Sequence, residues 1–99
     1  MRLDAEQRKA IREEVESAFG PRAAVRVFGS RLRENAAGGD VDLFVELPEV
    51  VEQPAWRASL FEARLMRRLS GRRVDVVLAS PDVMEQPIHR VARSEGVLP

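Results

Sequence analysis

A hydrophobic strand, a Gly-Ser turn and a second strand with two aspartates constrain this chain more than any other feature. The first strand ends at Phe28 and runs into Gly29-Ser30, and the second strand carries Asp40 and Asp42. Side chains alternate between the two faces of a strand, so the two aspartates point to one face. Neighbouring carboxylates repel each other unless a cation lies between them. The pattern therefore predicts a site for a hard divalent metal ion beside a phosphate-binding turn.

The composition fits one small folded domain that spans residues 1–99. The formal net charge is zero, so no overall field draws the chain to nucleic acid or to a membrane. The absence of cysteine excludes disulfides, thiolate zinc sites and a cysteine nucleophile. No apolar run approaches the roughly 20 residues of a membrane span, and the charged N-terminus lacks a signal-peptide core. We therefore expect a cytoplasmic protein.

Apolar periodicity and the positions of glycine and proline predict an α+β fold, in which a small mixed β-sheet is flanked by helices. The expected helices cover residues 4–19, 54–70 and 87–94, and a further short helix is expected after Ser30. The expected strands cover residues 24–28, 40–47 and 73–79. No repeat and no long linker divides the chain.

The third expected strand supplies a third candidate carboxylate. Asp75 lies among valines, where a charge is out of place in a purely structural strand. If this strand lies beside the second, Asp75 shares the face of Asp40 and Asp42. The plainer interpretation is that Asp40 is a turn residue and that the other two aspartates are solvated strand residues.

Electrostatic repulsion favours the metal-binding interpretation. Three carboxylates roughly 5 Å apart, at an effective dielectric constant of about 20, repel by about 3 kcal/mol per pair and about 10 kcal/mol in total. Such a cost rivals the stability of a small domain. Either a cation neutralises the cluster or some carboxylates stay protonated. A small set of oxygen ligands favours Mg²⁺ over zinc.

The Gly-Ser turn fits phosphate binding. Gly29 lets the backbone approach a phosphate closely. Ser30 offers a hydroxyl and an N–H group, and a helix that starts there directs free N–H groups toward an anion. Arg31 and Arg33 add positive charge beside the turn.

The combination of Gly29-Ser30 with Asp40, Asp42 and Asp75 resembles the signature of the DNA polymerase β-like nucleotidyltransferase superfamily. More narrowly, it is similar to the minimal nucleotidyltransferases of bacteria and archaea, over nearly the whole chain. The resemblance implies a palm-like sheet that holds two Mg²⁺ ions, with ATP as a substrate. It implies that the three aspartates are catalytic metal ligands and that the Gly-Ser turn holds the phosphates. Asp75 would also help to activate the attacking hydroxyl.

The resemblance also implies a partner protein. Such proteins are often encoded beside a HEPN-domain toxin or a substrate-binding protein, and act as antitoxins, in some cases by transferring AMP to a tyrosine of the toxin. The chain departs from the commonest motif at Gly39, where relatives have serine. It ends at Pro99 with no separate acceptor-binding domain, so we expect the acceptor surface from a partner or a second copy of the chain.

Two other functions are alternatives to nucleotidyl transfer. The first is a non-catalytic binding module of the same fold, which neutralises or supports its partner by forming a complex. The second is direct nucleic-acid binding, which fares worst because the chain has zero net charge and few aromatic residues for stacking.

Four more residues carry alternatives. Trp56 and Leu60 fall opposite the apolar stripe of their helix, which predicts exposure and a partner interface; the alternative is that the helix start buries Trp56 locally. Glu46 shares the face of Asp42 and is either an acid supporting the metal site or a solvated strand end. For His89, a surface or capping position is favoured over a role as a base.

Overall fold

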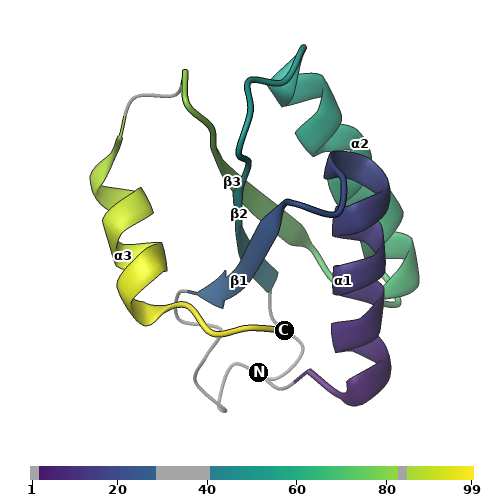
Figure 1. Ribbon diagram of the computed structural model, residues 1–99. Coiled ribbons are helices and arrows are strands. Elements are labelled where there is room, and N and C mark those ends of the chain that lie inside the picture. Colours follow the sequence, from purple (N-terminus) through teal and green to yellow (C-terminus); the bar gives the residue numbers. More distant parts are fainter. Residues whose placement is uncertain (1–2, 29–40, 83–84) are drawn as a thin grey trace.

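The structure is a computed structural model and describes residues 3–28, 41–82 and 85–99 (Figure 1). Its elements are α1 (Ala5–Phe19), β1 (Ala24–Phe28), β2 (Val41–Glu46), α2 (Pro54–Arg68), β3 (Val74–Ala79) and α3 (Pro87–Glu95). These bounds confirm three helices and three strands expected from the sequence, to within two residues at each end. The short helix expected after Ser30 lies outside the described residues.

Helix α1 begins and ends where its capping residues are. Asp4 Oδ1 accepts a hydrogen bond from Gln7 N at 2.8 Å, and the Gln7 side chain accepts one from Asp4 N at 2.9 Å. This reciprocal pair is a capping box, which satisfies two backbone donors at the helix start. Gly20 follows the helix with φ at 95°, a conformation that glycine adopts without a steric cost.

The sheet is small and mixed. Its order is β1-β2-β3, with β1 antiparallel to β2 and β2 parallel to β3. A parallel pair needs a crossover connection, and α2 provides it. The C-terminal segment adds one antiparallel bridge, from Val97 to Val27, at the outer edge of β1. The expected α+β class, with helices flanking a small mixed sheet, is therefore confirmed.

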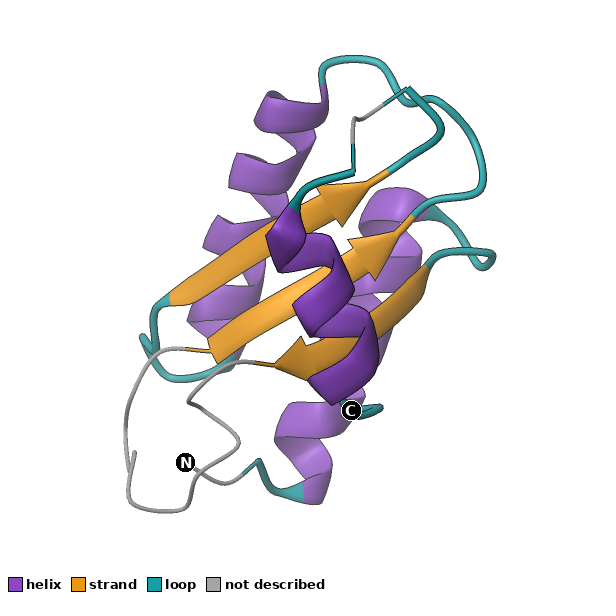
Figure 2. Ribbon diagram, turned by 90° about the vertical axis from the view of Figure 1, so that its left-hand side faces the viewer, coloured by secondary structure: helices purple, strands orange, loops and turns teal. Residues whose placement is uncertain are grey.

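Alternation along the strands divides the interior into two layers. In Figure 2 α3 crosses the front of the sheet, and the other two helices lie behind it. The layer beneath α1 and α2 is the larger, and its fully buried members include Ile11, Val41, Leu43, Phe61 and Leu65. The layer beneath α3 consists of Phe28, Phe44, Ala79 and Ala92. Full burial of one large apolar side chain contributes about 1.5–3 kcal/mol, so the larger layer dominates the stability.

Arg68 joins α2 to α1 at the surface. Its guanidinium donates to Glu13 at 2.9 Å and to Glu14 at 3.1 Å. The hydrogen bond from Arg68 lowers the pKa of the Glu13 carboxyl. A carboxylate with a lowered folded-state pKa contributes stability above its unfolded pKa and loses it as the pH falls through the folded value. The link between the two helices therefore weakens in acid.

A side chain from α2 covers part of the outer edge of β3. The backbone carbonyl groups of Arg73 and Ala79 accept hydrogen bonds from the β2 side. Backbone N–H and C=O groups alternate in direction along a strand, so those of the even-numbered residues between Arg73 and Ala79 point away from β2. Val76 is one of these, and its N–H donates to Glu62 Oε2 at 2.9 Å. An edge donor that is already satisfied cannot pair with a strand of another molecule.

We expect Glu62→Ala to lower the free energy of unfolding by about 1–3 kcal/mol, because the partly buried Val76 N–H loses its acceptor. Glu62→Gln keeps an amide oxygen at the same place and serves as the control, with an expected loss below about 1 kcal/mol. Urea unfolding followed by circular dichroism measures both. Equal losses in the two variants would show that this hydrogen bond does not stabilise the edge.

Candidate functional site

Asp42 and Asp75 lie side by side near the starts of β2 and β3. They are register partners in the parallel pair, so both side chains project from one face at the separation of adjacent strands, about 4.8 Å. That face is the one beneath α3, because Phe44 and Val77, two residues further along each strand, pack in the α3 layer. The third strand thus lies beside the second, as the acid cluster requires. The role of the two acids as metal ligands stays a prediction.

The two carboxylates have different neighbours. Arg73 Nε lies 3.5 Å from Asp75 Oδ1, and this ion pair offsets part of the negative charge. On the other side of the pair, Phe28 of β1 is the register partner of Asp42 and is buried. The Asp75 side chain is 46% exposed, so a solute can reach its carboxylate.

The other predicted site residues lie outside the described residues. They are Gly29, Ser30, Arg31 and Asp40. Their chain neighbours are described: Phe28 ends β1, Val41 begins β2, and Phe28 pairs with Asp42. Phe28 and Val41, the described residues on either side of this gap, therefore lie at the end of the sheet that carries the two acids.

The donor set of the acid pair fits a hard divalent cation. Asp42 and Asp75 offer carboxylate oxygens only, which are the ligands that Mg²⁺ prefers. Within residues 3–28, 41–82 and 85–99, no group of three or more His, Cys, Asp or Glu residues is arranged to hold a metal ion. The three-carboxylate site that the sequence predicts therefore depends on Asp40.

Glu46, at the far end of β2, fastens α3 to the sheet. Arg93 Nε donates to Glu46 Oε2 at 2.9 Å, and the same guanidinium pairs with Glu85. The hydrogen bond to Glu46 raises the pKa of Arg93. The guanidinium carbon also lies 5.4 Å from the centre of the Phe44 ring, within the range of a cation–π contact. Neither interpretation of Glu46 from the sequence included this ion pair.

His89 is a buried capping residue. It is 3% exposed, and its Nδ1 accepts a hydrogen bond from Gln86 N at 2.9 Å, at the start of α3. The capping position is confirmed, whereas the surface position is wrong, because the ring packs 5.8 Å from that of Phe44. Since Nδ1 accepts, the proton of the neutral ring is on Nε2. His89 thus positions α3.

Arg93 fastens α3 to the sheet through a contact that sequence reasoning missed. His89, Ala92 and Arg93 recur at i, i+3 and i+4, the spacing that puts side chains on one face of a helix. This spacing was the available signal. The structure places all three against the sheet, with Ala92 in the layer beneath α3.

Trp56 and Leu60 are exposed, as the helical spacing predicted. Their exposed fractions are 64% and 42%. The alternative that the start of α2 buries Trp56 is therefore wrong. Whether these residues contact a partner stays a prediction.

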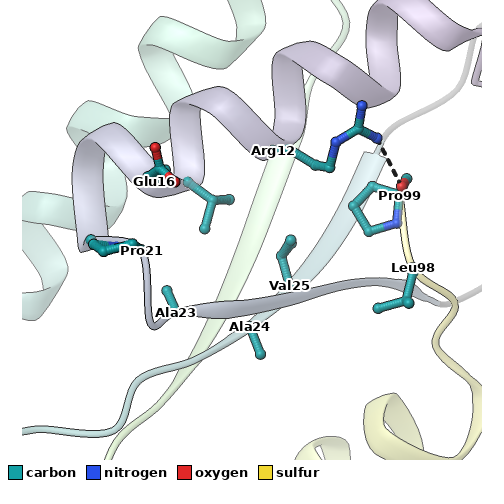
Figure 3. Close-up of a pocket in the computed structure, with 10 residues that line it drawn as sticks. Arg12, Glu16, Pro21, Ala23, Ala24, Val25, Leu98 and Pro99 are labelled. Atoms are coloured by element: carbon teal, nitrogen blue, oxygen red, sulfur yellow. Dashed lines mark hydrogen bonds between the residues drawn. The ribbon is translucent and has the colours of Figure 1, made fainter.

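A cavity of about 370 Å³ lies apart from the acid pair, between α1, β1 and the C-terminal residues (Figure 3). Arg12 Nη1 donates to Pro99 O at 3.1 Å beside it. Apart from Arg12 and Glu16, its lining is glycine and apolar residues. Glu16 is the only acidic side chain among these lining residues, so the cavity has no counterpart of the acid pair.

Comparison with known families and proteins gives a family match. A model of the nucleotidyltransferase domain matches residues 8–97, which include both acids of the pair. No curated protein and no solved structure matches the chain. In the described part of the chain, no helix has the length and apolar character needed to cross a membrane.

Proposed function

Because the chain belongs to the nucleotidyltransferase domain family, we propose that it transfers AMP from ATP to a hydroxyl group of a partner protein. Nucleotidyl transfer is the general activity that family membership supports. The nucleotide and the protein acceptor are the further content of the proposal. The observation that carries it is the register pairing of Asp42 with Asp75 on an accessible face of the sheet.

The residues divide the task by position. Asp42 and Asp75 would hold Mg²⁺ together with Asp40, and Gly29, Ser30 and Arg31 would hold the phosphates. When bound there, Mg²⁺ would neutralise charge on the triphosphate and on the departing pyrophosphate. The acceptor oxygen bonds to the α-phosphorus, the bond from that phosphorus to the bridging oxygen breaks, and pyrophosphate leaves. The half-exposed Asp75 orients the acceptor hydroxyl and receives its proton.

The partner in this proposal is a HEPN-domain toxin or a substrate-binding protein, and the chain is its antitoxin. Support comes from the resemblance of the Gly29-Ser30 and Asp40–Asp42 motifs to minimal nucleotidyltransferases. Attachment of AMP to the toxin would add a bulky, charged group at the modified hydroxyl. We place this reaction in the cytoplasm.

The test is a transfer assay with ATP labelled at the α-phosphate, Mg²⁺ and the product of the neighbouring gene. We expect a labelled partner, an AMP adduct by mass spectrometry, and release of pyrophosphate. An assay that gives no adduct with any of the four nucleoside triphosphates would overturn the proposal. A partner that binds tightly and stays unmodified would favour the non-catalytic binding module.

A non-hydrolysable ATP analogue at 100 times its Kd, with Mg²⁺, is expected to raise the melting temperature by about 11–22 °C. A ligand at 100 times its Kd stabilises by about 2.7 kcal/mol, and each kcal/mol shifts the melting temperature of a domain this small by about 4–8 °C. Differential scanning fluorimetry measures the shift. Asp42→Asn should abolish it, and EDTA should reverse it. An equal shift in wild type and Asp42→Asn would place the nucleotide elsewhere.

A further inference from the structure

The arginines of this protein differ in whether carboxylates neutralise them. Arg68 and Arg93 each contact two carboxylates. On α2, Arg57 Nε donates to a backbone carbonyl, that of residue 52, at 3.0 Å. No ion pair joins Arg64 or Arg67 to any carboxylate in the part of the chain that the structure describes. Unmatched positive charge therefore gathers on α2, although the whole chain is neutral.

These arginines share one exposed face with the apolar residues of α2. At 3.6 residues per turn, five positions fall within an arc of about 100° on the helix. We name them the α2 outer face: Trp56, Arg57, Leu60, Arg64 and Arg67. All five are exposed, and they lie opposite the buried stripe of the same helix, which packs against the sheet.

A recess of about 160 Å³ borders the α2 outer face, between α1 and α2. Its lining residues are Ser17, Ala18, Arg57, Leu60, Phe61 and Arg64. Small-molecule sites occupy about 300–1,000 Å³, so this recess is too small for a typical ligand and suits one apolar side chain. Arg57 and Arg64 stand beside it, where they can meet negative charges that flank such a side chain.

We propose that the α2 outer face docks a partner protein through a carboxylate-rich segment with one apolar anchor residue. Tryptophan and arginine are the residue types enriched at interface hot spots. A guanidinium binds a carboxylate through two parallel hydrogen bonds, which favours acidic partners. The anchor fills the recess beside Leu60, and the acidic residues neutralise Arg57, Arg64 and Arg67.

A protein fits this face better than a nucleic-acid strand does. A strand could stack one base on Trp56, but its neighbours would need further aromatic side chains. The four phenylalanines offer none, because each is buried or half-buried. A strand would also leave the apolar recess empty.

Tryptophan fluorescence can report this docking, because Trp56 is the only tryptophan of the chain. The probe is a synthetic glutamate-rich peptide of about 20 residues, long enough to form a helix, with one central leucine flanked by glutamates. We expect a saturable blue shift of the tryptophan emission. The same peptide with glutamines in place of the glutamates should bind about tenfold more weakly, because it lacks the charge complementarity.

Variants test which residues contact the peptide. Because Trp56→Ala removes the tryptophan signal, binding is measured by the fluorescence anisotropy of a fluorescein label on the peptide. Trp56→Ala should weaken binding at least about 30-fold, as expected of a hot-spot residue, with a nearly unchanged melting temperature. Arg64→Glu should weaken it about tenfold or more. Arg90→Glu makes the same charge change on the exposed side of α3 and should stay within about twofold of wild type.

Four results would overturn the proposal. They are the absence of saturable peptide binding, equal losses for Arg64→Glu and Arg90→Glu, tighter competing binding of a single-stranded oligonucleotide, and a dimer in light scattering that Trp56→Ala abolishes. The last two would assign the face to nucleic acid or to a second copy. Asp42→Asn should bind the peptide like wild type, so docking and nucleotidyl transfer can fail independently.

Discussion

Asp42→Asn is expected to lower the rate of nucleotidyl transfer by about 10²–10³-fold, the usual effect of removing one electrostatic contact to the transition state. The substitution preserves the shape of the side chain and the backbone of β2. It removes the charge that, beside Asp75, would hold a divalent cation against the triphosphate. The initial rate of AMP incorporation from labelled ATP, at saturating Mg²⁺, measures the effect.

Glu46→Gln is the matched control for Asp42→Asn. The residue lies on the same strand and the same face and undergoes the same change from carboxylate to amide. Its partner is Arg93, so it should retain nearly the full transfer rate and lose about 1 kcal/mol of stability at most. Activity of Asp42→Asn at the wild-type level, or an equal loss in Glu46→Gln, would contradict the proposed site.

Asp42→Asn also separates chemistry from binding. The acids and the α2 outer face lie on opposite sides of the sheet, so the variant should still form a complex with its partner, measured by size-exclusion chromatography. If it forms the complex and suppresses toxicity as well as wild type does, without any transfer, then the chain acts as a binding module.

Phe44→Ala is expected to lower the free energy of unfolding by about 3–5 kcal/mol, the usual cost of truncating a buried phenylalanine. Phe44 has no exposed surface. It packs against the His89 ring and lies beneath the Arg93 guanidinium. Because the layer beneath α3 has only four buried apolar members among the described residues, loss of this ring should also release α3. Urea unfolding and amide hydrogen exchange measure the two effects.

Two controls separate the loss of α3 from a general loss of stability. Phe44→Leu keeps an apolar side chain in the layer and should cost less than about 1.5 kcal/mol. Phe61→Ala removes a phenylalanine from the other layer, so it should lower global stability while exchange in α3 stays in step with the sheet. Exchange in Phe44→Ala that is no faster in α3 than in β2 would show that Phe44 does not anchor the helix.

The elements of this fold were predictable because their signals are local. The capping box of Asp4 and Gln7 and the left-handed Gly20 fix the ends of α1 within a few residues of sequence. Apolar alternation likewise separates Asp42 from its neighbours Val41 and Leu43. Strand order and register depend instead on which faces pack together, which no local signal encodes.

The site was predictable only in part, for the same reason. Side chains alternate between the two faces of a strand, so Asp42 and Asp75 are predicted on one face if their strands are neighbours. The pair of Arg93 with Glu46 joins residues 47 positions apart. The spacing of Arg93 with His89 and Ala92 indicates a shared helix face, but no local signal identifies Glu46 as the partner. His89 was expected at the surface or in a cap. Its burial follows from the docking of α3, which is a tertiary event.

The α2 outer face and the acid pair lie on opposite sides of the sheet. This arrangement places a condition on any single partner that binds α2 and is modified at the acids. The segment of the partner that carries the target hydroxyl has to reach from one side of the molecule to the other, and the shortest dimension of the molecule is 19 Å. An extended chain covers about 3.3–3.6 Å per residue, so that arm needs at least about six residues. The modified residue should therefore belong to a flexible loop or tail of the partner. Shortening that loop or tail should stop the modification without weakening the binding to α2.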